Sequence, residues 1–122
     1  SNLALNLNIA GSYGGRWDIV NACKKLIAAA GPASIDPETI TEQSLGQYMA
    51  LANQAEPDLL IRTGGDSRIS NFLLWQMAYT EFWFTATLWP DIDHSILENA
   101  IKEFSMRERR FGLTSAQIEA MP

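Results

Sequence analysis

Cysteine, histidine and long apolar runs are scarce in this sequence. Cys23 is the single cysteine, so an internal disulfide is excluded, and its place in an apolar helical pattern predicts a small buried side chain. No run reaches the roughly 18 uninterrupted apolar residues of a membrane-spanning helix. The first residues also lack the basic and apolar regions of a signal peptide. These absences predict a cytoplasmic protein in a reducing compartment.

The sequence also contains few positively charged residues. The chain has nine Lys and Arg residues against 14 Asp and Glu residues, for a net charge of -5, which argues against a main task of binding nucleic acid. We therefore expect no nucleic-acid partner, and any bound anion must be met by a local cluster of cations. Hydrophobic residues make up 47% of the sequence, which excludes a disordered chain and predicts a packed core.

The length of 122 residues corresponds to one ordinary domain or to a piece of a larger one. The sequence begins without Met and enters a strand-like pattern almost at once. We therefore expect a truncated chain in which residues 1–2 derive from cloning.

Hydrophobic periodicity predicts strands that alternate with helices. Alternating apolar residues predict a strand, and apolar residues three and four positions apart predict a helix. Ser70 and Asp93 stand where helix N-caps belong. This order predicts an α/β fold with a mainly parallel sheet, whose second strand is buried on both faces. The predicted strands cover residues 3–10, 58–61 and 82–84, and the predicted helices cover residues 17–30, 72–79 and 96–104, with a short helix after Thr41.

Residues 62–71 run from a predicted strand end through two glycines to a predicted helix start. Glycines let the backbone approach an anion, helix N–H groups favour negative charge, and Arg62 and Arg68 can each hold phosphate oxygens with two hydrogen bonds. Ser70 can add a hydroxyl donor. An ordinary turn with a cap and solvated arginines explains the spacing equally well. The two arginines are nevertheless the only Lys or Arg residues within positions 26–101, which favours a diphosphate cradle.

Three further segments carry candidate residues whose roles the pattern leaves open. In a second glycine loop, Tyr13 and Asp18 can lie beside the same ligand, or Asp18 can pair with a neighbouring arginine or the helix N-terminus. Glu81 needs a partner if it is buried, and both Mg²⁺ and an arginine are suitable. The arginines of residues 107–112 can complement a helix C-terminus, or they can place Arg110 at an anion site.

Five sequence blocks in a fixed order carry a resemblance to a known family. Together they resemble the C-terminal half of the cis-prenyltransferase family, specifically its bacterial undecaprenyl diphosphate synthases, over about residues 4–112. Any one block is modest support, whereas all five at compatible spacing make the resemblance specific. The blocks are YGGRWD at 13–18, DLLIRTGGDSRISNFLLWQ at 58–76, YTEFWF at 79–84, LWPD at 88–91 and RERRFG at 107–112.

The resemblance implies sequential condensation of isopentenyl diphosphate with farnesyl diphosphate to give undecaprenyl diphosphate, the lipid carrier for peptidoglycan. It implies that Arg62, Arg68 and Ser70 hold isopentenyl diphosphate, with Ile69 beside them. It also implies that Mg²⁺ is the cofactor and that Glu81 helps to bind it.

The resemblance further implies a homodimer. The helix that contains Trp75 and the aromatic strand after it would lie in the interface, and Arg110 and Gly112 would reach the partner's site. Tyr13 and Asp18 are lesser candidates near the site.

The sequence also departs from the family pattern. The family's catalytic Asp, its first phosphate loop and most of its product tunnel belong to an N-terminal half that this sequence lacks, so we expect the chain alone to be inactive. Asp66 replaces the more usual Glu, and Ser67 stands where His is common. Residues 1–122 are thus expected to be the C-terminal portion of one catalytic domain, with residues 113–122 as a tail.

Two other functions compete with this interpretation. One is a non-catalytic subunit that serves binding and dimerisation in a prenyltransferase complex, although such a subunit has less need of the intact arginine loop and Glu81. The other is a generic phosphate- or nucleotide-binding α/β domain. The sequence matches neither GxGxxG nor a Walker motif, which weakens the nucleotide alternative.

Overall fold

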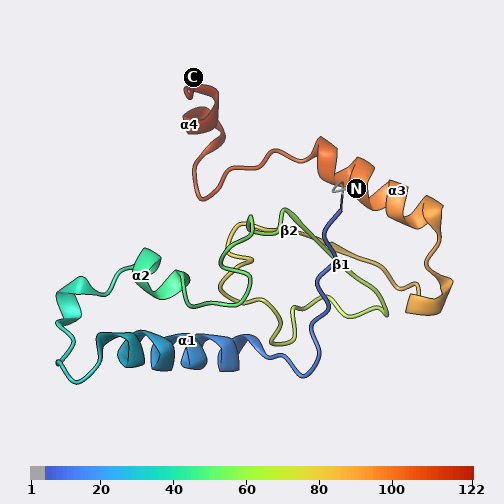
Figure 1. The fold of residues 1–122 in the computed structure, drawn as a ribbon. Coiled ribbons are helices and arrows are strands. Elements are labelled where there is room, and N and C mark those ends of the chain that lie inside the picture. The colour runs from blue at the N-terminus through green and yellow to red at the C-terminus, as the bar shows by residue number, and fades with distance from the viewer. Residues whose placement is uncertain (1–4) are drawn as a thin grey trace. The chain divides into compact units, whose positions relative to one another are not determined.

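The computed structural model describes residues 5–122 of the chain (Figure 1). The chain divides into two compact units. Residues up to 54 form the first unit together with residues 71–75, and the second unit comprises residues 55–70 and 76–122. Two helices dominate the first unit, and two strands with a long helix dominate the second.

Helix α1, Gly15–Ala30, is the longest element of the first unit. It ends where predicted, because Gly31 adopts a left-handed φ of 67° and donates its N–H to the carbonyl of Ala28. Helix α2, Glu42–Gly46, lies alongside α1 (Figure 1). Thr41 caps α2 in a reciprocal pair with Ser44, so the short helix predicted after Thr41 is confirmed.

The start of α1 packs closely against the segment 71–75. Gly15 is buried, and its N–H donates to the carbonyl of Asn71 at 2.7 Å. The Asn71 side chain accepts a second hydrogen bond, from the backbone N–H of Arg16, at 2.9 Å. Ala22 and Leu73 are buried in the same unit, so this contact forms part of its small core.

Two predictions for the first unit are wrong. Of the predicted strand 3–10, residues 3–4 lie outside the described residues, and residues 5–10 form no strand. Leu5, Leu7 and Ile9 are each at least 80% exposed, because a strand needs a hydrogen-bonding partner and none pairs with this segment among residues 5–122. Cys23 is exposed on α1 rather than buried.

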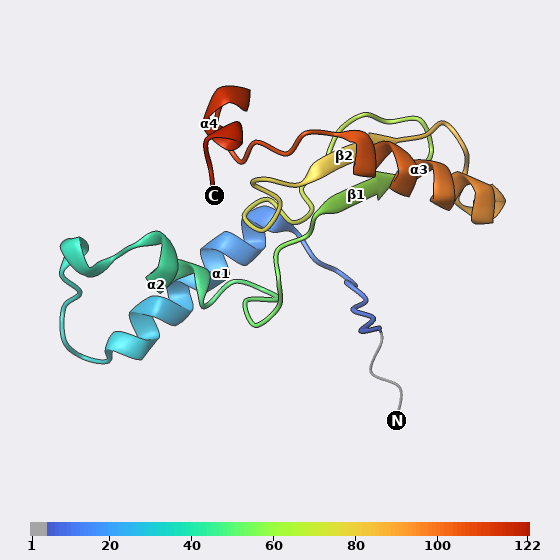
Figure 2. The ribbon, with the colours of Figure 1, turned by 90° about the horizontal axis from the view of Figure 1, so that it is seen from above.

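The second unit contains a parallel pair of strands, β1 Leu59–Arg62 and β2 Glu81–Phe84. Figure 2 shows the two strands side by side and pointing the same way, with helix α3, His94–Met106, next to them. Both strands were predicted, and their parallel pairing confirms the α/β class. All four residues of β1 are half-buried, however, because this two-stranded sheet does not enclose β1 on both faces as predicted.

Helix α3 begins at the predicted cap. The Asp93 carboxylate accepts hydrogen bonds from the backbone N–H of Ile96 at 3.0 Å and from the Ser95 hydroxyl at 2.8 Å. These two bonds favour the ionised form and lower the pKa of Asp93. On the sheet side, the indole N–H of Trp83 donates to Glu103 at 2.5 Å, and this bond joins β2 to α3.

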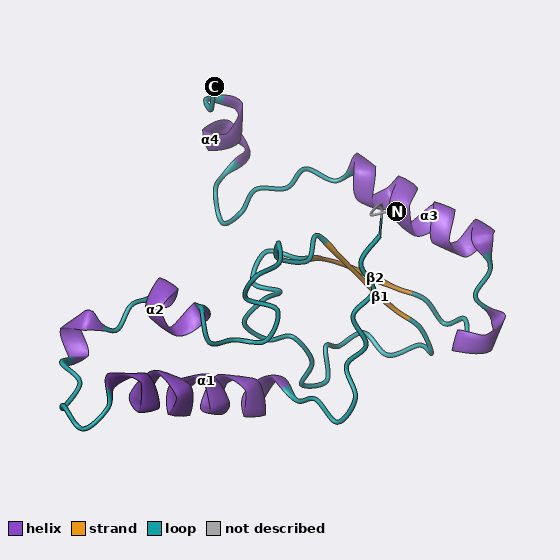
Figure 3. Cartoon of the chain, viewed as in Figure 1, coloured by secondary structure: helices purple, strands orange, loops and turns teal. Residues whose placement is uncertain are grey.

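The predicted helix 72–79 is absent. Turns occupy this segment, and Figure 3 shows the connection between β1 and β2 as loop throughout. Ser70 and Asn71 have φ values of 55° and 58°, in the left-handed region, whereas an N-cap residue has an extended backbone. The apolar side chains divide between the units instead, with Leu73 buried in the first and Met77 in the second.

The C-terminal residues hold one element that the sequence did not predict. Helix α4, Ser115–Glu119, begins at Thr114, which forms a reciprocal cap with Gln117. Within residues 5–122, none of the helices is long and apolar enough to cross a membrane.

Candidate functional site

The loop that follows β1 brings together the arginines predicted as a cradle. Gly64 and Gly65 have φ values of 91° and 93°, which L side chains rarely adopt, and they reverse the chain after Arg62. Their N–H groups donate to the carbonyls of Thr87 and Thr85 at 2.9 and 3.0 Å. These glycine N–H groups are therefore already hydrogen-bonded. Since no helix follows the loop, the expected helix-dipole contribution to anion binding is also missing.

Asp66 lies between the two arginines. Its carboxylate binds the Nη2 atom of Arg62 at 3.1 Å and the Nη2 atom of Arg68 at 2.8 Å. The Nη1 atom of Arg62 donates to the Ser70 hydroxyl at 2.8 Å and to the backbone carbonyl of Arg68. The structure thus brings Arg62, Arg68 and Ser70 together, with both arginines on the Asp66 carboxylate and Ser70 on Arg62. Half-buried Ile69 is next to Ser70 in the chain.

The exposure of these side chains shows what the cluster can bind. The side chain of Arg62 is 25% exposed, whereas those of Arg68 and Asp66 are 68% and 48% exposed. Arg62 is therefore held in place, and an oxyanion from solvent can reach both guanidinium groups. A phosphate group presents the same paired oxygens as a carboxylate, and guanidinium groups bind both with parallel hydrogen bonds. The two guanidinium groups therefore carry donors of the kind that a phosphate requires.

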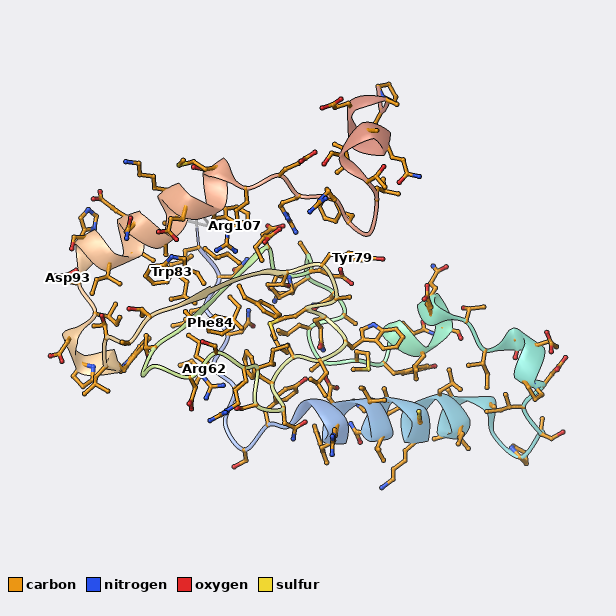
Figure 4. All side chains as sticks on the ribbon, turned by 180° about the vertical axis from the view of Figure 1, so that it is seen from behind. Arg62, Tyr79, Trp83, Phe84, Asp93 and Arg107 are labelled. Atoms are coloured by element: carbon orange, nitrogen blue, oxygen red, sulfur yellow. The ribbon has the colours of Figure 1, made fainter. Side chains whose placement is uncertain are left out.

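Glu81 lies at the opposite end of the strand pair. In the register of the sheet, Glu81 pairs with Leu59 and Phe84 pairs with Arg62. Glu81 and Arg62 are therefore three residues apart along the strand direction, which corresponds to about 10 Å. Figure 4 shows Arg62 beside Phe84. The structure does not bring Glu81 to the arginine cluster within one chain.

An arginine is the partner of Glu81 in this structure. The Nη1 atom of Arg107 lies 3.3 Å from the Glu81 carboxylate and donates to the carbonyl of Phe82 at 2.7 Å. Residues 5–122 contain no group of three or more His, Cys, Asp or Glu side chains that could hold a metal ion. Glu81 nevertheless offers a hard oxygen ligand. Because Mg²⁺ commonly binds one or two carboxylates together with substrate phosphates, this donor fits Mg²⁺ once a diphosphate is present.

The Arg110–Gly112 segment lies near the amino end of β2 and not at the arginine cluster. Gly112 has a φ of 83° and lies against the Tyr79 ring, which precedes β2. Arg110 is exposed, and its side chain has no hydrogen bond or ion pair with any of the described residues. Arg109, which the sequence did not single out, binds Asp58 at 2.6 Å. The only features of the sequence that could have predicted the Arg109–Asp58 pair are the charged RERR block and the Asp that precedes β1.

Tyr13 and Asp18 are held together in the first unit. The Tyr13 hydroxyl donates to the Asp18 carboxylate at 2.5 Å, and the other carboxylate oxygen accepts the backbone N–H of Ala50 at 2.9 Å. Asp18 is only 1% exposed, and the Tyr13 ring meets Phe72 edge to face. These contacts fix the start of α1 against residue 50.

Comparison with known proteins gives a consistent result. A family model described as "Putative undecaprenyl diphosphate synthase" matches residues 1–112. The chain is 56% identical over 118 residues to the ditrans,polycis-undecaprenyl-diphosphate synthase ((2E,6E)-farnesyl-diphosphate specific) of Xanthomonas axonopodis, covering 97% of this chain and 46% of that protein. It is 54% identical over 119 residues to the isoprenyl transferase of Ralstonia nicotianae, covering 98% and 45%.

Solved structures agree with the sequence relatives. The lavandulyl diphosphate synthase of Lavandula x intermedia, solved in complex with dimethylallyl diphosphate, matches with a TM-score of 0.76 and 41% identity, over 83% of this chain and 44% of that one. A probable undecaprenyl diphosphate synthase from Campylobacter jejuni matches with a TM-score of 0.66 and 39% identity, over the same shares of the two chains. The chain spans about half the length of the relatives it matches. With the family model matching most of its residues, the chain belongs to the undecaprenyl diphosphate synthase family of prenyltransferases.

Proposed function

We propose that this chain carries the isopentenyl-diphosphate-binding part of a cis-prenyltransferase. In the whole protein, isopentenyl diphosphate units are condensed sequentially onto farnesyl diphosphate to give undecaprenyl diphosphate, the lipid carrier for peptidoglycan. The observation that carries the proposal is the pair of guanidinium groups bridged by Asp66 in an otherwise acidic chain. The name of the Xanthomonas axonopodis relative specifies farnesyl diphosphate and supports the choice of the second substrate.

The proposed binding step exchanges one anion for another. The diphosphate of the substrate displaces the Asp66 carboxylate and accepts hydrogen bonds from Arg62 and Arg68, while Ser70 donates its hydroxyl. Ile69 contributes an apolar contact beside them. Because the chain carries a net charge of -5, these arginines supply the local positive charge that the substrate needs.

Glu81 is the proposed ligand for Mg²⁺. When bound, the metal neutralises charge on the diphosphate, including the charge that develops as an allylic diphosphate ionises. The single carboxylate of Glu81 suits a metal whose remaining ligands come from phosphates and water. Glu81 must first leave Arg107, its partner at 3.3 Å.

We further propose a homodimer with shared sites. Glu81 and the Arg110–Gly112 segment belong to the amino ends of the strands, whereas the arginine cluster follows the carboxyl end of β1. A second copy can therefore supply Arg110 and Gly112 to the cluster of the first. The aromatic strand β2 and Trp75, in the turns before it, are the proposed interface. Tyr13 and Asp18 are proposed to shape the neighbouring loop.

The remaining parts of the proposal concern the whole protein. The 122 residues span about half of each relative, and we propose that they do not catalyse the reaction by themselves. The proposed substrates are water-soluble diphosphates, and the product is a membrane lipid. Cytoplasmic localisation stays a prediction of the sequence.

Competition binding tests the proposed ligand class. We expect the chain to bind isopentenyl diphosphate at least about tenfold more tightly than ATP, because the cluster contacts a diphosphate and has no site for a base. Calorimetric titration of both ligands measures this difference, and Lys24→Met, which removes an exposed charge outside the cluster, should leave it unchanged. Equal affinity for the two ligands would instead support the generic nucleotide-binding alternative.

The role of Glu81 is tested by metal titration. In a chimaera that carries these residues in place of the matched stretch of the Xanthomonas axonopodis synthase, Glu81→Ala is expected to raise the Mg²⁺ concentration for half-maximal activity about tenfold. Glu98→Ala, which removes a carboxylate that is 67% exposed on α3, is the matched control. Identical Mg²⁺ curves for Glu81→Ala and the unaltered chimaera would remove Glu81 from the metal site.

A further inference from the structure

The three arginines of the segment 107–110 have different surroundings. Arg107 binds Glu81 and the carbonyl of Phe82. Arg109 binds Asp58 at 2.6 Å and the carbonyl of Tyr79 at 3.0 Å. The side chain of Arg110, by contrast, is exposed and has no such partner within residues 5–122. Two arginines are therefore anchored, and the one between Arg109 and Phe111 is presented to solvent.

Arg109 is the more enclosed of the anchors. Its side chain is 21% exposed, against 35% for that of Arg107. The guanidinium carbon lies 4.5 Å from the centre of the Phe111 ring and 5.7 Å from that of Phe104. Arginine stacks well on aromatic faces because its planar cation meets the negative face of the ring. Arg109 thus combines two hydrogen bonds with two aromatic contacts.

The backbone after Arg109 folds back over it. Phe111 and Gly112 have φ values of 48° and 83°, both in the left-handed region, so the chain reverses there. The Phe111 ring lies 5.8 Å from the Tyr79 ring, and the N–H of Leu113 donates to the carbonyl of Arg110 at 2.8 Å. A non-glycine residue is strained in the left-handed region, so the surrounding contacts must stabilise Phe111 in this conformation. Arg109 supplies the contact beneath the Phe111 ring.

The partners of Arg109 lie just before the two strands. Asp58 directly precedes β1, and Tyr79 precedes β2 by two positions, so one side chain fastens the segment to the amino ends of the sheet. Figure 4 shows Arg107 beneath α3, and its contacts to Glu81 and Phe82 join the end of α3 to β2. The segment is therefore attached at two points, and Arg110 follows the second of them.

We infer that Arg109 is a positioning residue. Its ion pair with Asp58 and its stack on Phe111 hold the reversed backbone of residues 110–113, and this conformation points Arg110 outward toward the anionic ligand of a second copy. The inference rests on the proposed function for the ligand of Arg110, but the conformational part is independent of it. Lysine cannot replace Arg109 fully, because it lacks the planar fork that reaches Asp58 and Tyr79 while it stacks.

Amide hydrogen exchange of the chain tests the conformational part. In Arg109→Met, we expect the Leu113 amide to exchange at least about tenfold faster. The amide of Thr85, which directly follows β2 and donates to the carbonyl of Arg62 at 3.0 Å, should be unchanged. Arg109→Lys is expected to restore part of this protection, and Lys24→Met is expected to leave it intact. Unchanged exchange at Leu113 would overturn the inference, and so would an equal acceleration at Thr85, since that result would mean a loss of overall stability.

Ligand affinity distinguishes the role of Arg109 from that of Arg110. For isopentenyl diphosphate, Arg109→Met and Arg110→Ala are each expected to weaken binding about fivefold to tenfold, and the double variant is expected to be no weaker than Arg110→Ala alone. Additive losses would overturn the inference that Arg109 acts through Arg110. If Arg110→Ala binds normally, the proposed ligand role of Arg110 fails, while exchange at Leu113 still decides whether Arg109 holds the segment.

Discussion

Replacing Arg62 by alanine is expected to weaken isopentenyl diphosphate binding by roughly 2–5 kcal/mol, as for loss of one member of a partly buried charge-assisted contact. Arg62 is the best-held member of the cluster, with its side chain 25% exposed and hydrogen bonds to Asp66, Ser70 and the Arg68 carbonyl. Its removal takes away a proposed phosphate ligand and also breaks the hydrogen bonds that Arg62 makes to Ser70 and to the Arg68 carbonyl. Calorimetric titration of the variant measures the change in Kd.

Arg68→Ala is expected to fall at the lower end of the same range, because its side chain is 68% exposed and solvent screens its charge. Arg62→Lys keeps the charge but loses the fork, so an intermediate affinity is expected. Lys24→Ala removes an exposed charge outside the cluster and should bind normally. Normal affinity in both the Arg62→Ala and Arg68→Ala variants would count decisively against the cradle.

Gly15→Ala is expected to destabilise the chain by about 3 kcal/mol or more, through overpacking against backbone. A Cβ at this position would lie 2.0 Å from the carbonyl oxygen of Phe72 and 2.6 Å from Cγ of Leu74. Relief by movement is blocked, because the N–H of Gly15 is hydrogen-bonded to the Asn71 carbonyl at 2.7 Å. Urea unfolding followed by fluorescence measures the loss.

Gly11→Ala provides the matched control for that experiment. A Cβ on Gly11 would have no neighbour within 4 Å, and its φ lies outside the left-handed region. Its unfolding free energy should therefore change by no more than about 0.5 kcal/mol. If Gly15→Ala and Gly11→Ala unfold at the same urea concentration as the unaltered chain, the close approach of α1 to residues 71–75 is wrong.

Elements with strong local signals could be predicted from the sequence. Helix α1 follows from its apolar spacing and the glycine that ends it, and α3 follows from its spacing and the cap at Asp93. The strands β1 and β2 pair in parallel as predicted, although the predicted helix between them is absent, and each strand is a short apolar run in the sequence. Such signals act within a few residues and do not depend on the rest of the chain.

Elements that depend on distant partners could not be predicted. Residues 5–10 alternate like a strand, but alternation does not supply the neighbouring strand that a sheet requires. Residues 72–79 are apolar on most sides, and periodicity cannot tell whether such a segment forms a helix or divides its side chains between two cores. Ser70 and Asn71 are not glycines, so the sequence contained no signal for their left-handed backbone.

In the candidate site, too, contacts between residues close in the chain could be predicted and contacts between distant residues could not. The grouping of Arg62, Arg68 and Ser70 follows from their closeness in the chain, since one reversing loop carries all three. The Arg107 partner of Glu81 is 26 residues away, and the Arg109 partner Asp58 is 51 residues away, so only the fold brings them together. The sequence left the partner of Glu81 open between a metal and an arginine for this reason.

The most direct test follows the guanidinium groups themselves during ligand binding. In ¹H–¹⁵N spectra of the arginine side chains, titration with isopentenyl diphosphate is predicted to shift the resonances of Arg62 and Arg68 together, with the midpoint found by calorimetry, as the diphosphate replaces Asp66. Arg109, which binds Asp58, should keep its resonance. Saturable binding that leaves the Arg62 and Arg68 resonances in place would contradict the account.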